Sequence, residues 1–280
     1  NIGYKNGRFI KMQVPKRVHT DNIDPKYQNR IIQEGKIIKI DAADIYYKEL
    51  NALLRTVIQS NGIERVEVYN VCGQRYIGTD LNTDIQIAVY GTTGNDLGAF
   101  MNGPQIHVYG NAQDATGNTM NEGQIIINGH AGDLTGHSMR GGKIFVKDYV
   151  GYRTGIHMKE YQKKVPTIVI GETVGDFLSE YMAGGIIVVL GLNLKECEEC
   201  NARFVGTGMH GGVIYERNKI LNPSEGTKTM PVNKKDLQTI EKLVNQYCSH
   251  FGGDPKAILS SEFYKILPTS KRPYEKLYSH

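Results

Sequence analysis

Residues 87–158 repeat one phrase four times: IAVYGTTGNDLGAFM (87–101), IHVYGNAQDATGNTM (106–120), IIINGHAGDLTGHSM (125–139) and IFVKDYVGYRTGIHM (144–158). The copies begin 19 residues apart. Each opens with isoleucine, has valine or isoleucine two positions later, and carries a glycine and a methionine at fixed offsets. A period near 20 residues with short alternating apolar runs is typical of a solenoid of stacked coils.

The phrase continues in weaker form after residue 158. Residues 168–182 read IVIGETVGDFLSEYM, with Ser179 in place of the repeated glycine, and 205–212 read VGTGMHGG. The insertions KEYQKKVP (159–166) and LKECEECNARF (194–204) separate these copies. We therefore predict an all-β solenoid, a right-handed parallel β-helix of about seven coils, over residues 63–217.

Residues at the same position of successive coils form ladders, because coils of a parallel β-helix stack about 4.8 Å apart. We expect the isoleucine and valine columns inside, with flexible methionine filling a corner of the interior. The glycine column marks tight turns with positive φ. A thioether site for Cu(I) is the alternative for the methionines. The methionine column is Met101, Met120, Met139, Met158, Met182 and Met209.

The N-terminal side contains one helical pattern. Residues 1–40 are polar and aperiodic, and we expect an extended arm. Residues 41–62 are expected to form a capping helix, with Asp41 or Asp44 as N-cap and apolar residues at three- and four-residue steps. An alternating strand begins at Ile63, and Val68 precedes Ile87 by the 19-residue step, which assigns these two residues to one column.

The C-terminal side, residues 218–280, is expected to be a helical extension with a tail. Asn233 is the predicted N-cap of a helix that Gly252 ends, with Asp236 at the third position of a capping box. Asp254 and Pro255 are typical of the start of a second, short helix. The proline-broken tail from residue 263 is expected to dock in extended form onto a neighbour.

Composition sets the class of protein. The net charge is +4, and the basic residues are scattered, which argues against nucleic-acid binding. No apolar run reaches the length of a membrane span, and no signal peptide opens the chain, which starts at Asn1. Four cysteines are too few for a disulfide framework, so we expect free thiols and a cytoplasmic protein.

Glycine triplets in the repeats invite a nucleotide-binding interpretation. They are Gly91/Gly94/Gly98, Gly129/Gly132/Gly136 and the GTGMHG run at 206–211. A dinucleotide fingerprint needs a helix after its glycines and an acidic residue about 20 positions later. Here another strand pattern follows each phrase, so we expect no phosphate or cofactor site.

Two groups of residues have the chemistry of a metal or catalytic site. Cys197 and Cys200 form a CxxC whose nearest third ligand is His210, while Cys72 and Cys248 are distant in sequence. The alternative is an acidic surface loop, and we expect no metal.

The second group is a column of carboxylates. Asp114, Asp133 and Asp176 share one coil position, eight residues after the isoleucine column. Stacked carboxylates suit a cation or the acid and base of a polysaccharide-cleaving enzyme. Aspartate is also an ordinary turn residue, and we expect no catalytic residue.

The stretches NVCGQRYIG (70–78) and GTGMHGG (206–212), with IDA (40–42), YYKELN (46–51) and LLR (53–55), carry a family resemblance. Together with the repeats, they resemble the family formed by the C-terminal domain of the glutamate synthase large chain (GXGXG, domain 3), in its stand-alone version. The repeat alone is also similar to one of the subunits of formylmethanofuran dehydrogenase, a member of the same solenoid superfamily.

The resemblance implies a right-handed parallel β-helix that is architectural within a larger oxidoreductase. In glutamate synthase, ammonia from an amidotransferase domain travels to an FMN domain and reacts with 2-oxoglutarate. We accordingly expect a subunit without catalytic activity of its own, serving glutamate biosynthesis in nitrogen metabolism. Its partners would be amidotransferase and FMN-domain subunits, and association with further copies of itself is left open.

Overall fold

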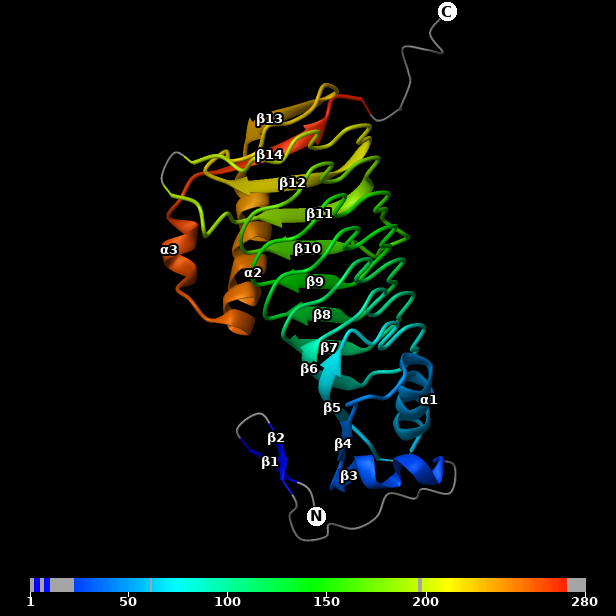
Figure 1. The fold of residues 1–280 in the computed structure, drawn as a ribbon. Coiled ribbons are helices and arrows are strands. Elements are labelled where there is room, and N and C mark those ends of the chain that lie inside the picture. Colours follow the sequence, from blue (N-terminus) through cyan, green and yellow to red (C-terminus); the bar gives the residue numbers. More distant parts are fainter. Residues whose placement is uncertain (1–2, 6–7, 11–22, 61, 196–197, 271–280) are drawn as a thin grey trace, which may run out of the picture.

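The computed structural model describes residues 3–5, 8–10, 23–60, 62–195 and 198–270. Twelve strands form one sheet in the order β13-β14-β12-β11-β10-β9-β8-β7-β6-β5-β4-β3. Strands β4 to β12 are parallel and lie like rungs along a solenoid (Figure 1). The predicted parallel β-solenoid is confirmed, although it has about six turns and not about seven, because the repeat gives way at both ends to other structure. A separate antiparallel pair joins β1 (Gly3–Lys5) and β2 (Arg8–Ile10).

The central rungs follow the repeats. Their bounds are β5 Arg65–Cys72, β6 Gln86–Thr92, β7 Gln105–Tyr109, β8 Gln124–Ile127, β9 Lys143–Val146, β10 Thr167–Ile170, β11 Ala183–Val189 and β12 Gly211–Arg217. The isoleucine column is in register from Ile87 through Ile106, Ile125, Ile144, Ile168 and Ile187 to Ile214. All seven side chains are buried in one core. Since side chains alternate along a strand, the residues between these columns face outward.

The first coil departs from the expected register. Val66, and not Val68, pairs with Ile87, while Val68 pairs with Val89. The strand then shifts, so that Val71 pairs with Gly91. The coil thus contains more residues than the repeat, and an irregularity in β5 absorbs them, as β-bulges do.

The corners of the coils each contain three residues in the left-handed region. In the coil of β8 these are Leu134, Gly136 and Ser138, with φ of 59°, 71° and 52°. Only the middle one repeats as glycine. A Cβ on Gly136 would lie 2.4 Å from the Cδ1 of Ile168, two strands further along the chain. Glycine is therefore required by the interior, whereas its neighbours tolerate side chains.

The N-terminal end is more ordered than an extended arm. Strands β3 (Ile31–Glu34) and β4 (Ile37–Asp41) form an antiparallel hairpin, and β4 pairs in parallel with β5. The prediction of an arm over 1–40 is wrong for residues 31–40, because the alternating residues Ile38 and Ile40 are fully buried there. Residues 1–2, 6–7 and 11–22 lie outside the described part.

Helix α1 (Tyr47–Ile58) connects β4 to β5. Its buried residues, Leu50, Leu53, Leu54 and Val57, join the same core as the coils. The predicted N-cap is wrong: Tyr46 occupies that position without a capping side chain. Asp41 instead accepts a hydrogen bond from the backbone N–H of Ala43 at 3.1 Å.

Helix α2 (Lys234–Phe251) covers part of the outer face of the sheet (Figure 1). Asn233 and Asp236 form the predicted capping box, and Gly252 with φ of 82° follows the helix. Asp254 caps the short helix α3 (Pro255–Leu259), as expected. Helix α2 packs its apolar side on the outward residues of β9 to β12. The resulting second core contains Phe145, Val169, Val188, Tyr215, Ile240, Leu243, Val244 and Tyr247.

The tail differs from its prediction. Strand β14 (Phe263–Pro268) lies antiparallel between β12 and β13 (Thr227–Pro231), so this part docks onto its own sheet and not onto a neighbour. Its buried residues Phe263 and Ile266 contribute to the two cores. Residues 271–280 are outside the described part of the chain.

Candidate functional site

The methionine column serves packing. Met101, Met120, Met139, Met158 and Met182 are completely buried and Met209 is 5% exposed. They belong to the same core as the isoleucine ladders. A flexible thioether chain fits the irregular corner between the left-handed residues and the next strand. Their burial among aliphatic side chains favours packing over a Cu(I) site.

The glycine triplets also serve coil stacking. A Cβ on Gly91 would lie 2.1 Å from the carbonyl oxygen of Val71, and one on Gly94 would lie 2.2 Å from that of Gly73. These glycines allow close backbone approach between neighbouring coils. A dinucleotide fingerprint requires a helix after its glycines. Each of these triplets is instead followed by the next strand of the solenoid.

The three aspartates tie one coil to the next. Asp114 accepts a hydrogen bond from the backbone N–H of Asp133 at 2.9 Å, and Asp133 accepts one from that of Tyr152 at 2.8 Å. Asp176 accepts from the backbone N–H of Arg203 and from its guanidinium, both bonds lowering the pKa of this carboxyl. Carboxylates engaged in this way act as braces between coils.

The CxxC stretch is only partly described, because Cys197 lies outside the described residues. Cys200 is buried, and its thiol donates to the carbonyl oxygen of Val174 at 3.4 Å. The ring of His210 lies 3.3 Å from the carbonyl of Gly208, a near neighbour in sequence. Among the described residues, no three His, Cys, Asp or Glu side chains gather as a metal-binding group.

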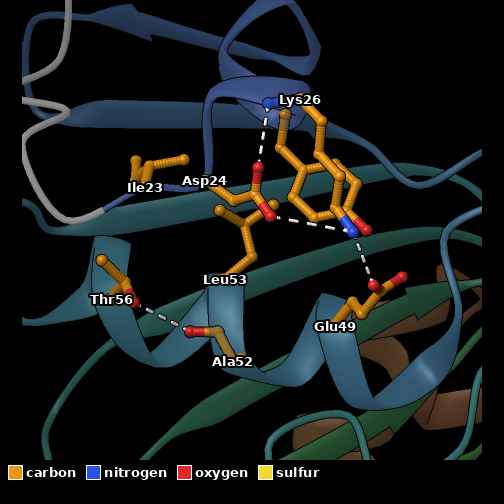
Figure 2. A pocket seen from close by; sticks show the side chains of 8 residues that line it. Ile23, Asp24, Lys26, Glu49, Ala52, Leu53 and Thr56 are labelled. Carbon is orange, nitrogen blue, oxygen red and sulfur yellow. Dashed lines mark hydrogen bonds and ion pairs between the residues drawn. The ribbon is translucent and has the colours of Figure 1, made fainter.

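A shallow pocket of about 220 Å³ lies between α1 and the short helix η1 (Pro25–Arg30) (Figure 2). The ammonium of Lys26 lies 2.7 Å from Glu49 and 3.7 Å from Asp24. The hydrogen bond to Lys26 lowers the pKa of Glu49. The ion pair between Lys26 and Glu49 joins η1 to α1, so the charged residues of this pocket have a structural role.

The outer face of β5 to β7 carries a ladder of aromatic rings that the repeat pattern did not predict. The rings of Tyr69 and Tyr90 are 4.5 Å apart and those of Tyr90 and Tyr109 are 4.7 Å apart, all nearly parallel. His107 stacks on Tyr109 at 4.1 Å and contacts the amide of Asn128 at 2.6 Å. Tyrosine in the same place of VEVY, IAVY and IHVY was the available signal.

At the base of this ladder, Glu67 joins two side chains. Its carboxylate accepts from the guanidinium of Arg65 at 2.9 Å and from the hydroxyl of Tyr69 at 2.7 Å. Burial, then Glu67, raise the pKa of Tyr69. The apolar side of α2 packs on β9 to β12, so the tyrosine ladder of β5 to β7 is not part of that core.

A second aromatic surface lies along the left-handed corners of the later coils. Phe177 stacks on Phe204 at 4.7 Å, and the guanidinium of Arg153 lies over the Phe177 ring. His157 stacks on Tyr181 at 5.5 Å. Phe204 is 50% exposed. Clustered exposed aromatic residues are typical of surfaces that contact other molecules.

Comparison with known proteins places these features in a family. The sequence matches the GXGXG motif over residues 55–269. It is 46% identical over 251 residues to an uncharacterized protein of Methanocaldococcus jannaschii, covering 86% of this chain and 96% of that protein. It is 31% identical over 114 residues to ferredoxin-dependent glutamate synthase 2 of Synechocystis, a match spanning 36% of this chain and 7% of that enzyme.

A solved structure shares the fold. A chain of the formyltransferase/hydrolase complex of Methylorubrum extorquens superposes with a TM-score of 0.57 at 18% identity, over 81% of this chain and 89% of that one. Within the described residues, no helix is long and apolar enough to cross a membrane. The repeats that build the solenoid and the match over most of its length lead to one conclusion: the chain belongs to the GXGXG motif family.

Proposed function

We propose that this chain is a non-catalytic structural subunit of a glutamate synthase-like complex in ammonia assimilation. The similarity to a 114-residue part of ferredoxin-dependent glutamate synthase carries the proposal. That part is 7% of the enzyme, so the chain corresponds to one small piece of a much larger catalyst. In this proposal, amidotransferase and FMN-domain subunits of the cytoplasm supply the chemistry, and the solenoid holds their arrangement.

The contacts within the chain support a structural role. The repeated methionine and glycine columns are taken up by packing. The repeated aspartates hold backbone N–H groups of neighbouring coils. The positions at which a repeat would present identical chemical groups are thus used to join coils. The surfaces left for contact with partners are the aromatic face of β5 to β7 and the aromatic corners.

Purification of the tagged chain from its source, followed by identification of the bound proteins, tests this proposal. We expect amidotransferase-type and FMN-domain proteins to accompany it in fixed ratio. The isolated chain should show no glutamate synthase activity, either alone or after FMN is added. Stoichiometric FMN on the isolated chain would refute the assignment.

A scaffold in a formyl-transferring complex is the second candidate. The observation that favours it is the fold shared over 89% of a chain in the formyltransferase/hydrolase complex, in line with the resemblance of the repeat to formylmethanofuran dehydrogenase. The same purification separates the two candidates. Molybdopterin- or ferredoxin-type partners would favour the second, whereas amidotransferase and FMN-domain partners favour the first.

A further inference from the structure

A groove runs along one flank of α2, on the outer face of the sheet. It has a volume of about 440 Å³, and its floor includes Gly103, Gly123 and Gly142. On the sheet side it is lined by Gln105, Gln124 and Lys143, which occupy one register position of β7, β8 and β9. We call this feature the α2 groove.

Helix α2 borders the groove, because two of the residues that line it contact the helix. The ammonium of Lys143 donates to the side-chain oxygen of Gln246 at 2.8 Å, and the amide of Gln124 lies 2.6 Å from the ring of His250. Gln246 and His250 are four residues apart, so they share a stripe of the helix that also contains Lys242. The stripe of α2 beside the groove therefore carries one lysine, one amide and one imidazole.

The charges in the groove repel one another. Burial, followed by Lys242, lowers the pKa of Lys143. Burial, followed by His107 and Lys143, lowers the pKa of His250. Both shifts arise because the charged forms lose water and face other cationic groups. An anion seated among these side chains would offset the repulsion between the cationic groups.

The nearby carboxylates are already engaged or point elsewhere. Glu122, beside the floor, pairs with Lys164 at 2.9 Å. Glu67 pairs with Arg65 at the far end of the sheet face. Glu241 comes one residue before Lys242 and therefore lies about 100° away from it around the helix axis. Asp148 and Glu172 lie near Tyr247, on the other flank of the helix. The cationic flank of α2 thus differs from its acidic flank.

The shape of the groove fits a length of polypeptide. Its three floor glycines have no side chains because a Cβ on any of them would lie within 3 Å of an atom of the preceding coil. They span two rung spacings, or about 10 Å, which three or four extended residues cover. The amides of Gln105 and Gln124 provide hydrogen-bonding groups suited to a peptide. A nucleic acid would call for a longer basic stripe than two lysines.

We propose that the α2 groove receives a short acidic segment of a partner subunit. The inference rests on the proposed function only in taking the partner to be another subunit of the complex. Carboxylates of the segment face Lys143 and Lys242, while its backbone lies along the glycine floor. The groove thereby gives the scaffold a charge-selective contact beside its aromatic face.

Binding of a fluorescent hexapeptide, Glu-Asp-Glu-Glu-Asp-Glu, to the full chain tests this directly by anisotropy. The double variant Lys143→Gln/Lys242→Gln should weaken binding roughly tenfold. The matched control, Lys147→Gln/Lys234→Gln, removes the same charge from exposed positions and should leave binding unchanged. Absence of binding, or equal weakening by the control, overturns the proposal. So does tighter binding of a labelled dT6 oligonucleotide that the groove variant also weakens.

Hydrogen exchange on the purified complex separates this inference from the proposed function. Protection of residues 105–109, 124–127 and 242–251 on partner binding supports the groove contact. Glutamate synthase-type partners without that protection would overturn the groove contact alone. Protection by partners of another class would leave the groove contact standing and overturn the functional assignment.

Discussion

Gly136 faces the Cδ1 of Ile168 so closely that a Cβ on the glycine would lie 2.4 Å from it. The same relationship recurs along the solenoid: Gly98 faces Ile125, Gly117 faces Ile144 and Gly155 faces Ile187. The glycine column and the isoleucine column are therefore two halves of one contact. A change to either half should be felt by the other.

Gly136→Ala should lower the free energy of unfolding by about 2–4 kcal/mol. Alanine at φ of 71° costs roughly 1 kcal/mol, and overpacking against Ile168 adds about 1–3 kcal/mol. Urea denaturation measures the loss. Gly35→Ala is the matched control, because its φ is 61° and no atom lies within 4 Å of a Cβ there. Adding Ile168→Val, which removes the Cδ1, should restore part of the loss.

Ser179→Gly should raise the free energy of unfolding by about 1 kcal/mol. Ser179 occupies the glycine column with φ of 60°, and its hydroxyl is buried without a hydrogen-bond partner. Glycine removes both the strained backbone and the unpaired polar atom. Thermal and urea unfolding check the sign. A loss of stability on this change would contradict our account of the glycine column.

Replacement of Asp114 and Asp133 by alanine should cost about 0.5–1.5 kcal/mol for each lost brace, since a backbone N–H of the next coil then loses its acceptor. Asp133→Asn retains the acceptor oxygen and should cost less. These variants also test the alternative to a scaffold, a β-helix enzyme that acts on polysaccharides through these aspartates. Release of sugar ends from polysaccharides by the wild type, lost in both Asp133 variants, would favour that enzyme over the scaffold.

Glu216 makes stability depend on pH. It pairs in register with Val189 and so points inward, where one carboxylate oxygen accepts from the N–H of Leu221 at 2.7 Å and the other has no partner. Burial raises the pKa of Glu216 to about 7, against about 4.3 in an unfolded chain. The folded protein therefore binds this proton more tightly. Its contribution is complete below about pH 4 and is lost as pH rises through 7.

Urea denaturation at pH 5 and pH 8 measures this effect. The wild type should lose on the order of 3 kcal/mol from Glu216 over the full titration. Glu216→Gln cannot titrate and should show a smaller decline than the wild type. The control Glu225→Gln, at an exposed loop position, should decline as the wild type does. Equal pH dependence in all three proteins would show that Glu216 is not responsible.

The repeat predicted most of the interior because coil stacking repeats a contact at constant spacing. Ile87, Ile106 and Met120 could be placed inside from their positions alone, and they are buried. The left-handed residues that flank each glycine could not be found this way. Leu134 and Ser138 are half-buried and are not glycine, so their left-handed conformation leaves no compositional signal.

The ends of the solenoid were harder to predict for a related reason. β3 and β14 pair antiparallel with the outermost parallel strands, and no repeat unit announces such pairing. The Tyr46 N-cap lacks a capping side chain, so the usual residue preference pointed to the aspartates instead. The α2 groove is formed by segments more than 100 residues apart, joined by Lys143 and Gln246, a proximity that periodicity does not reveal.

The antiparallel strands at both ends give the solenoid a fixed length. Twelve strands in one sheet span eleven intervals of about 4.8 Å, or about 53 Å. Beyond β12 and β4 the direction of the chain reverses, so a second copy cannot simply continue the parallel stack. The length of the solenoid can therefore change only in steps of whole coils. Gain or loss of one coil would move everything attached beyond it by one interval, without altering the surfaces of the remaining coils.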